Sequence, residues 1–123
     1  ANVKIADDQM HSIQLMNWAD VCIDLATSVV FEAVRLKKPV LAADYLHAGR
    51  SAIAVYMPET ELRCRDDVYE KIQRFLTEGT ENFYIESHRQ HFLDQMLDVG
   101  GKDVLAHYIA LLESTAKLNE KKQ

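Results

Sequence analysis

The chain has 123 residues, of which 48% are hydrophobic, and a chain of this length forms one domain that needs neither a disulfide nor a metal for stability. Its 14 basic and 19 acidic residues give a formal net charge of −5, which argues against a nucleic-acid polymer as partner because such binding needs a basic surface. We see no signal peptide and no apolar run long enough for a membrane span, and the two cysteines are far apart in sequence. These features predict a cytoplasmic location, peripheral at a membrane only through a parent protein.

The first part of the chain alternates between predicted strands and helices. Residues 2–6 are expected to form a strand, and residues 9–19 a helix whose apolar side chains give it one buried face. The chain begins without methionine and within this first strand. We therefore expect it to be a piece of a longer protein.

The next predicted strands flank a helix that begins at Thr27. Residues 21–25 form a short, mostly apolar strand, and residues 39–43 form an apolar run typical of a strand buried on both faces. About ten helical residues lie between them, so the strands should be parallel, because antiparallel neighbours need only a short turn.

The remaining segments complete an α/β fold. Residues 52–57 and 61–65 are expected to add strands, and helices are expected over residues 66–77, 88–97 and 102–118. The apolar side chains of the last helix are expected to be buried, and they are Val104, Leu105, Tyr108, Ile109, Leu111 and Leu112. The order of elements predicts a three-layer α/β/α sandwich around a parallel, Rossmann-like sheet.

A candidate anion site lies at the start of the helix that follows the predicted strand at residues 21–25. Thr27 and Ser28 occupy the carboxyl end of that strand, where helix N–H groups commonly bind phosphate. Glu32 lies deeper than a capping-box glutamate would, and a carboxylate can accept hydrogen bonds from both hydroxyls of a ribose. The competing interpretation makes Thr27 the helix N-cap and pairs Glu32 with Arg35 on the surface.

Four further residues are weaker candidates for the same site. His47 and Arg50 follow the second strand of the pair, where they could contact a diphosphate or neutralise its charge, although a solvated loop is the simpler interpretation. Met10 and His11 follow the first predicted strand and could contact a nucleotide base, although the start of a buried helix is the preferred explanation.

A metal site is not expected. His88, His91 and Asp94 share one face of a predicted helix at spacings of three residues, whereas zinc-binding histidines on helices more often stand four apart. A solvated helix face is the preferred interpretation of these three side chains.

Residues 17–45 resemble the C-terminal nucleotide-binding domain of GT-B glycosyltransferases, and residues 92–112 are similar to the terminal region of that domain. The resemblance rests on an aspartate-ended strand at 20–24, small residues at 26–28, the pair Glu32-Ala33 and the run 38–40, Lys-Pro-Val. It is closest to surface-carbohydrate transferases and CDP-glycerol glycerophosphotransferases. It implies that Thr27 and Ser28 lie beside the diphosphate of the donor and that Glu32 binds its ribose.

The sequence departs from this family at two glycine positions. The phosphate turn contains no glycine, and Lys37 replaces the glycine that precedes the Lys-Pro pair. We therefore expect the helix to end without a left-handed cap.

Together these features predict the donor-binding portion of a glycosyltransferase or glycerophosphotransferase in surface-polymer synthesis. Its partner would be a nucleotide diphosphate-sugar or a CDP-glycerol-type donor, with no separate cofactor. The acceptor-binding domain would lie in the missing part of the enzyme, so the fragment alone should be inactive. Two alternatives remain, namely a domain of a sugar-nucleotide 2-epimerase and a non-catalytic α/β interaction module.

Overall fold

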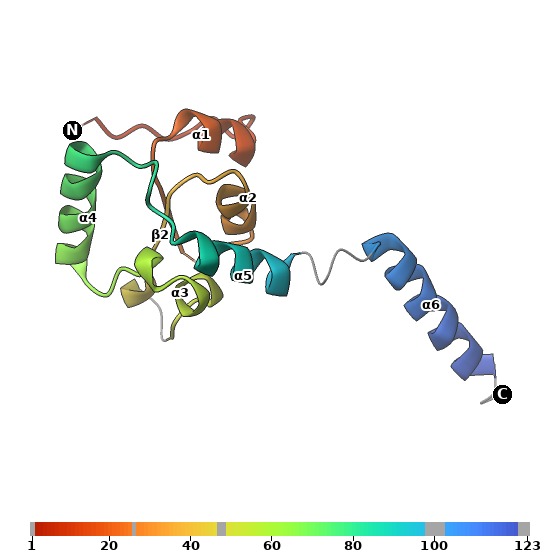
Figure 1. Cartoon of the computed structure of the whole chain (residues 1–123). Helices are drawn as coiled ribbons and strands as arrows, with labels where there is room; N and C mark the ends of the chain where they lie inside the picture. The colour runs from red at the N-terminus through yellow and green to blue at the C-terminus, as the bar shows by residue number, and fades with distance from the viewer. Residues whose placement is uncertain (1, 26, 47–48, 98–102, 121–123) are drawn as a thin grey trace.

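The computed structural model describes residues 2–25, 27–46, 49–97 and 103–120. Within these residues, two short parallel strands, β1 (Cys22–Asp24) and β2 (Val40–Ala42), form the only sheet. Cys22 lies opposite Val40 and Asp24 lies opposite Ala42. Helix α2 (Val29–Arg35) connects the two strands (Figure 1). The prediction of a parallel pair joined by a helix is therefore confirmed.

Helices make up most of the rest of the described chain. They are α1 (Ser12–Trp18), α3 (Ala52–Tyr56), α4 (Arg65–Glu78), α5 (Glu86–Met96) and α6 (Val104–Glu120), with 3-10 turns η1 (Asp44–Leu46) and η2 (Pro58–Thr60). In Figure 1, α4 lies on one side of the strands, whereas α2, α3 and α5 lie on the other, and α6 stands apart.

Strand β2 is buried on both faces. Val40 and Ala42 belong to a cluster that includes residues of α1, α2, α3 and α5, with the fully buried Phe92 among them. Leu41 and Ala43 belong to a second cluster, in which Leu62 is buried and side chains of α4 pack from outside. The continuous apolar run in this part of the sequence reflects these two covered faces.

The predicted three-layer sandwich with a Rossmann-like sheet is wrong, because the sheet of the described residues has two strands. Residues 2–6 form no strand, and the side chains of Val3 and Ile5 are 84% and 98% exposed. A strand needs a neighbour to satisfy its backbone groups, and the sequence pattern alone does not supply one. The expected strand at 61–65 is reduced to a single bridge between Glu61 and Ala42, beside which the Leu62 N–H donates to the Ala42 carbonyl at 2.9 Å.

The strand predicted at 52–57 is wrong, because residues Ala52–Tyr56 form helix α3 and Met57 follows as its C-cap. The Ser51 side chain caps this helix by accepting a hydrogen bond from the Ala54 N–H at 3.4 Å. Ile53, Ala54 and Met57 are buried while Val55 is exposed, which is the pattern of one helix face. A short apolar run does not distinguish a strand from a buried helix, and here the cap favours the helix.

Helix α2 ends in a left-handed residue, contrary to the expectation from the missing glycine. Lys37 adopts φ 56°, its N–H donates to the Val34 carbonyl, and the Lys38 N–H donates to the Ala33 carbonyl. This pair of bonds is a Schellman motif. A lysine therefore holds the conformation that glycine would adopt without strain.

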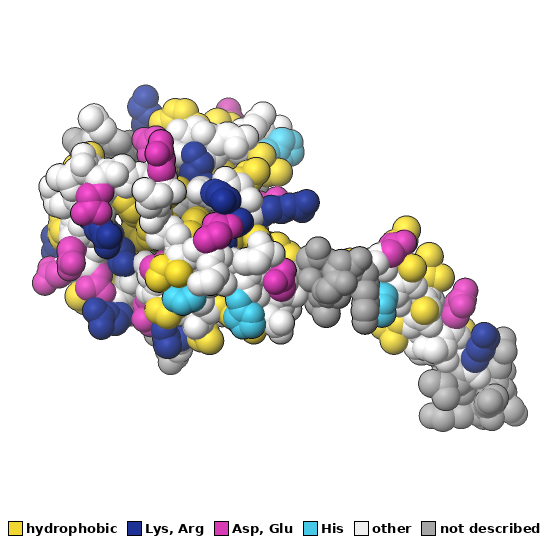
Figure 2. All heavy atoms as spheres, viewed as in Figure 1, with side chains coloured by type: hydrophobic (Ala, Val, Ile, Leu, Met, Phe, Trp, Pro, Cys, Tyr) yellow, Lys and Arg dark blue, Asp and Glu magenta, His cyan; other side chains and the backbone are white. Residues whose placement is uncertain are grey.

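The apolar side chains of α6 are exposed, so their predicted burial is wrong. We call them the α6 apolar face, and their exposed fractions range from 46% to 68% for Val104, Leu105, Tyr108, Ile109, Leu111 and Leu112. Figure 2 shows hydrophobic side chains gathered along this helix. No helix within the described ranges is both long and apolar enough to cross a lipid bilayer.

Candidate functional site

The candidate site lies at the carboxyl edge of the two strands. Asp24 is the last residue of β1, and Thr27 and Ser28 follow it before α2 begins. Asp44 follows β2 and is buried. The turn after β1 and the turn after β2 are thus brought to the same edge of the sheet, as parallel strands require.

Thr27 is bound to Asp24 and does not cap α2. The Asp24 carboxylate accepts a hydrogen bond from the Thr27 N–H at 2.9 Å and another from the Thr27 hydroxyl at 2.5 Å. Ser28 is the N-cap, with helical φ of −67° and ψ of −17°, and its side chain makes no capping hydrogen bond. The cap predicted at Thr27 is therefore displaced by one residue, and the Thr27 hydroxyl already has a partner.

The first backbone bonds of α2 are long. The Val30 N–H donates to the Thr27 carbonyl at 3.4 Å, and the Phe31 N–H donates to the Ser28 carbonyl at 3.3 Å. Bonds of this length lie beyond the usual range for an N–H donor and a carbonyl, so they hold these donors weakly. The opening turn of α2 retains hydrogen-bonding capacity toward an acceptor outside the helix.

Glu32 is exposed on the first turn of α2. Because four residues advance about 40° beyond a full turn, Glu32 lies on nearly the same side of the helix as Ser28. No ion pair joins Glu32 to Arg35 among the described residues, although the surface interpretation expected one. The Glu32 carboxylate thus faces solvent one helical turn from the Ser28 side chain.

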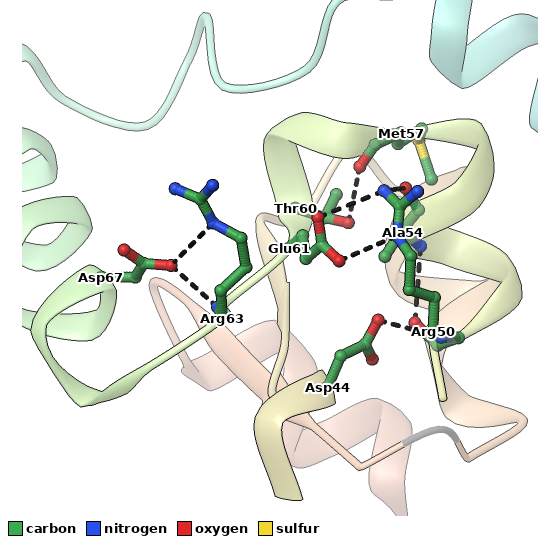
Figure 3. A network of polar contacts seen from close by, with 9 residues as sticks. Asp44, Arg50, Ala54, Met57, Thr60, Glu61, Arg63 and Asp67 are labelled. Carbon is green, nitrogen blue, oxygen red and sulfur yellow. Dashed lines mark hydrogen bonds and ion pairs between the residues drawn. The ribbon is translucent and has the colours of Figure 1, made fainter. Parts of the chain in front are cut away.

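The turn after β2 is organised by its own polar contacts (Figure 3). Asp44 accepts a hydrogen bond from the Ser51 N–H at 2.9 Å. The Arg50 guanidinium donates to both carboxylate oxygens of Glu61, at 2.8 and 3.1 Å, and to the Ala54 carbonyl at 2.9 Å. Arg50 is therefore already paired, and its charge does not neutralise Asp24 or Asp44.

Met10 and His11 lie at the start of α1, and both are exposed. The Met10 N–H donates to the Asp7 carbonyl at 2.9 Å, and the His11 N–H donates to the Gln14 side chain at 3.2 Å. Within the described ranges no hydrogen bond or ion pair joins either residue to the turn after β1. His47 lies outside the described residues.

The three residues considered for a metal site have other contacts. His88 lies 3.0 Å from the Glu59 carboxylate, the His91 ring lies against Tyr56, and Asp94 accepts a hydrogen bond from Gln90 at 2.8 Å. The described part of the chain holds no cluster of three or more histidine, cysteine or acidic side chains suited to a metal ion.

Asp24 organises the turn after β1, although it was not among the site residues predicted from the sequence. An aspartate at the end of a strand is a turn signal, because its carboxylate can accept hydrogen bonds from the N–H groups that follow it. The same carboxylate adds negative charge at the edge where an anion was expected to bind.

An open groove of about 650 Å³ lies at the opposite end of β1, where Trp18 and Val21 precede the strand.

Comparisons of the whole chain with protein-family models, with curated proteins and with solved structures gave no match. The resemblance to GT-B transferases therefore rests on the motifs at 17–45 and 92–112 alone.

Proposed function

We propose that the turn after β1 and the first turn of α2 bind the diphosphate and ribose of a nucleotide-activated donor. The chain would then be the donor-binding portion of a glycosyltransferase or glycerophosphotransferase in surface-polymer synthesis. The observation that carries this proposal is the position of Glu32, exposed and without an ion pair among the described residues, one turn after Ser28. A structural surface glutamate would gain from pairing with Arg35, three residues away.

In this proposal each group has a defined role. The Ser28 hydroxyl and the weakly held N–H groups of the opening turn donate to phosphate oxygens. The Glu32 carboxylate accepts hydrogen bonds from the two ribose hydroxyls. During transfer, the positive end of the α2 dipole would stabilise the charge that develops on the departing nucleotide diphosphate.

The Asp24 carboxylate limits the strength of this site. Its negative charge repels phosphate, and its bonds to Thr27 remove one hydroxyl that the family resemblance had placed beside the diphosphate. We therefore expect weak binding from this chain alone, with a dissociation constant on the order of 1 mM, or about −4 kcal/mol.

A second candidate is a non-catalytic α/β interaction module. The same Asp24–Thr27 contact favours it, because a turn that satisfies its own donors needs no ligand. The exposed apolar face of α6 also favours it, since exposed apolar patches commonly mark interaction sites.

A calorimetric titration separates the two candidates. The chain would be titrated with CDP, UDP, GDP and ADP, with CMP and UMP as monophosphate controls. Binding that is selective for one diphosphate over its monophosphate supports the donor site. If all six nucleotides bind equally or not at all at 10 mM, the interaction module is the better description.

A further inference from the structure

The chain carries two apolar surfaces that nothing in the described structure covers. One is the α6 apolar face. The other is the open groove of about 650 Å³ at the amino end of β1, which we call the Trp18 groove. Its apolar lining includes Trp18, Val21, Ile72, Phe75 and Leu76, and the side chains of Trp18 and Leu76 are 83% and 75% exposed.

Helix α6 has the pattern of a packing helix. At about 100° per residue, its six exposed apolar side chains fall within an arc of about 160°, with Ala110, Glu113 and Lys117 on the opposite side. Its start is well formed, because the Asp103 carboxylate accepts hydrogen bonds from the Leu105 and Ala106 N–H groups at 3.0 and 3.2 Å. The helix has 17 residues, and most of the stability of such a helix in a protein comes from packing of its apolar face.

The Trp18 groove belongs to the opposite side of the molecule from α6. It is bounded by the last two turns of α4 and by the segment between α1 and β1. The chain then enters α5, which is about 16 Å long and leads away from α4 toward α6 (Figure 1). The helix and the groove of one molecule are thus separated by the body of the fold.

We propose that the α6 apolar face packs into the Trp18 groove of a second copy of this chain, so that two copies exchange their α6 helices. This contact is independent of the proposed nucleotide site, which lies at the other end of β1. Reciprocal exchange would cover the α6 apolar face and the Trp18 groove of both copies. The resulting dimer would have two-fold symmetry.

The area available is sufficient for a stable dimer. Each of the six side chains leaves roughly 100 Å² exposed, so the two α6 faces would bury about 1,200 Å² before the groove surfaces are counted. Stable protein–protein interfaces bury about 1,200–2,000 Å² in total. The two α6 faces therefore reach the lower limit of this range when all six side chains of each copy are fully covered.

Sedimentation equilibrium of the full chain from 5 to 200 µM tests the dimer. We expect a species of twice 14.1 kDa that dissociates on dilution. Leu105→Lys combined with Leu112→Lys should give a monomer, and so should Trp18→Lys in the groove. Ala110→Lys adds the same charge to the polar side of α6 and should leave the dimer intact. Circular dichroism of each variant checks that the body remains folded.

A mixed cross-linking experiment identifies the occupant of the groove. Both chains carry Cys64→Ser, and an isotope-labelled Leu112→Cys chain is mixed with an unlabelled Leu76→Cys chain before oxidation. A disulfide that joins labelled to unlabelled chain is expected. A monomer at every concentration would overturn the proposal, as would a dimer that Trp18→Lys leaves unchanged. A disulfide that forms only within one chain, in a doubly substituted Leu76→Cys/Leu112→Cys protein, would also overturn it.

Discussion

The Asp24 carboxylate accepts two hydrogen bonds from Thr27, from its N–H at 2.9 Å and from its hydroxyl at 2.5 Å. This contact fixes the turn that connects β1 to α2. It also sets the chemistry of the carboxyl edge, because one carboxylate consumes two donors that would otherwise face a ligand. The turn is therefore stabilised at the expense of anion affinity.

Replacing Thr27 by valine should lower the free energy of unfolding by about 1 kcal/mol, because the Asp24 carboxylate loses its hydroxyl donor while side-chain volume is kept. Urea unfolding followed by circular dichroism measures this change. Thr27→Ser keeps the hydroxyl and should lie close to the parent. Equal losses for valine and serine would show that the hydroxyl contact contributes nothing to stability.

Replacing Lys37 by glycine should raise the free energy of unfolding by about 1 kcal/mol. Lys37 holds a left-handed conformation at φ 56°, which glycine adopts without the clash of a Cβ atom. The ion pair lost with Glu86 spans 3.4 Å between exposed side chains and contributes only a few tenths of a kcal/mol. Thermal and urea unfolding of the two proteins make the comparison.

The matched control for Lys37→Gly is Gly79→Ala. Gly79 ends α4 with φ 78° and ψ −177°, a conformation almost restricted to glycine, although no atom would crowd an added Cβ. This variant should lose about 1–3 kcal/mol from backbone strain alone. A destabilised Lys37→Gly protein would mean that the Lys37 side chain contributes more than its backbone conformation costs.

Acid should weaken the fold through Glu86. Hydrogen bonds from Arg89, and secondarily from Lys37, lower the pKa of Glu86 from 4.5 to about 2 in the folded chain. Because the folded pKa lies below the unfolded one, this contribution is complete above about pH 4.5 and is lost as the pH falls toward 2. Arg89 is buried and also donates to the Val34 carbonyl at 3.2 Å, so the contact joins α5 to the end of α2.

Urea unfolding of the parent and of Glu86→Gln between pH 2 and 6 tests this effect. The stability difference between the two proteins should be largest above pH 4.5 and should shrink toward pH 2. A difference that stays constant across this range would show that Glu86 titrates normally in the folded protein.

The sequence predicted the β1–α2–β2 unit because the signals for it are local. A continuous apolar run at 39–43 indicates a strand covered on both faces. The helix of about ten residues predicted between the strands, of which α2 forms seven, allows a parallel crossover and not a hairpin. The end of α4 is also set locally, because Gly79 supplies a positive φ of 78° that stops the helix.

The wrong predictions concern segments whose structure depends on residues far away in the sequence. Residues 52–57 carry a pattern that suits a strand or a buried helix, and the Ser51 cap, held by Asp44 from the preceding turn, favours the helix. Residues 2–6 alternate as a strand would, but the sheet provides no neighbour for them. The periodicity of α6 predicted an apolar face correctly, but periodicity does not specify which surface covers that face.

The most direct test of the proposed site compares a ribose with its dideoxy analogue. The nucleoside diphosphate that binds best and its 2′,3′-dideoxy form would be titrated calorimetrically into the parent, into Glu32→Gln and into Glu70→Gln on α4 as a surface control. We expect the parent and Glu70→Gln to prefer the ribose form by about tenfold, or 1.4 kcal/mol, and Glu32→Gln to lose this preference. Equal affinity of the parent for the two forms, or an unchanged preference in Glu32→Gln, would contradict a ribose-binding role for Glu32.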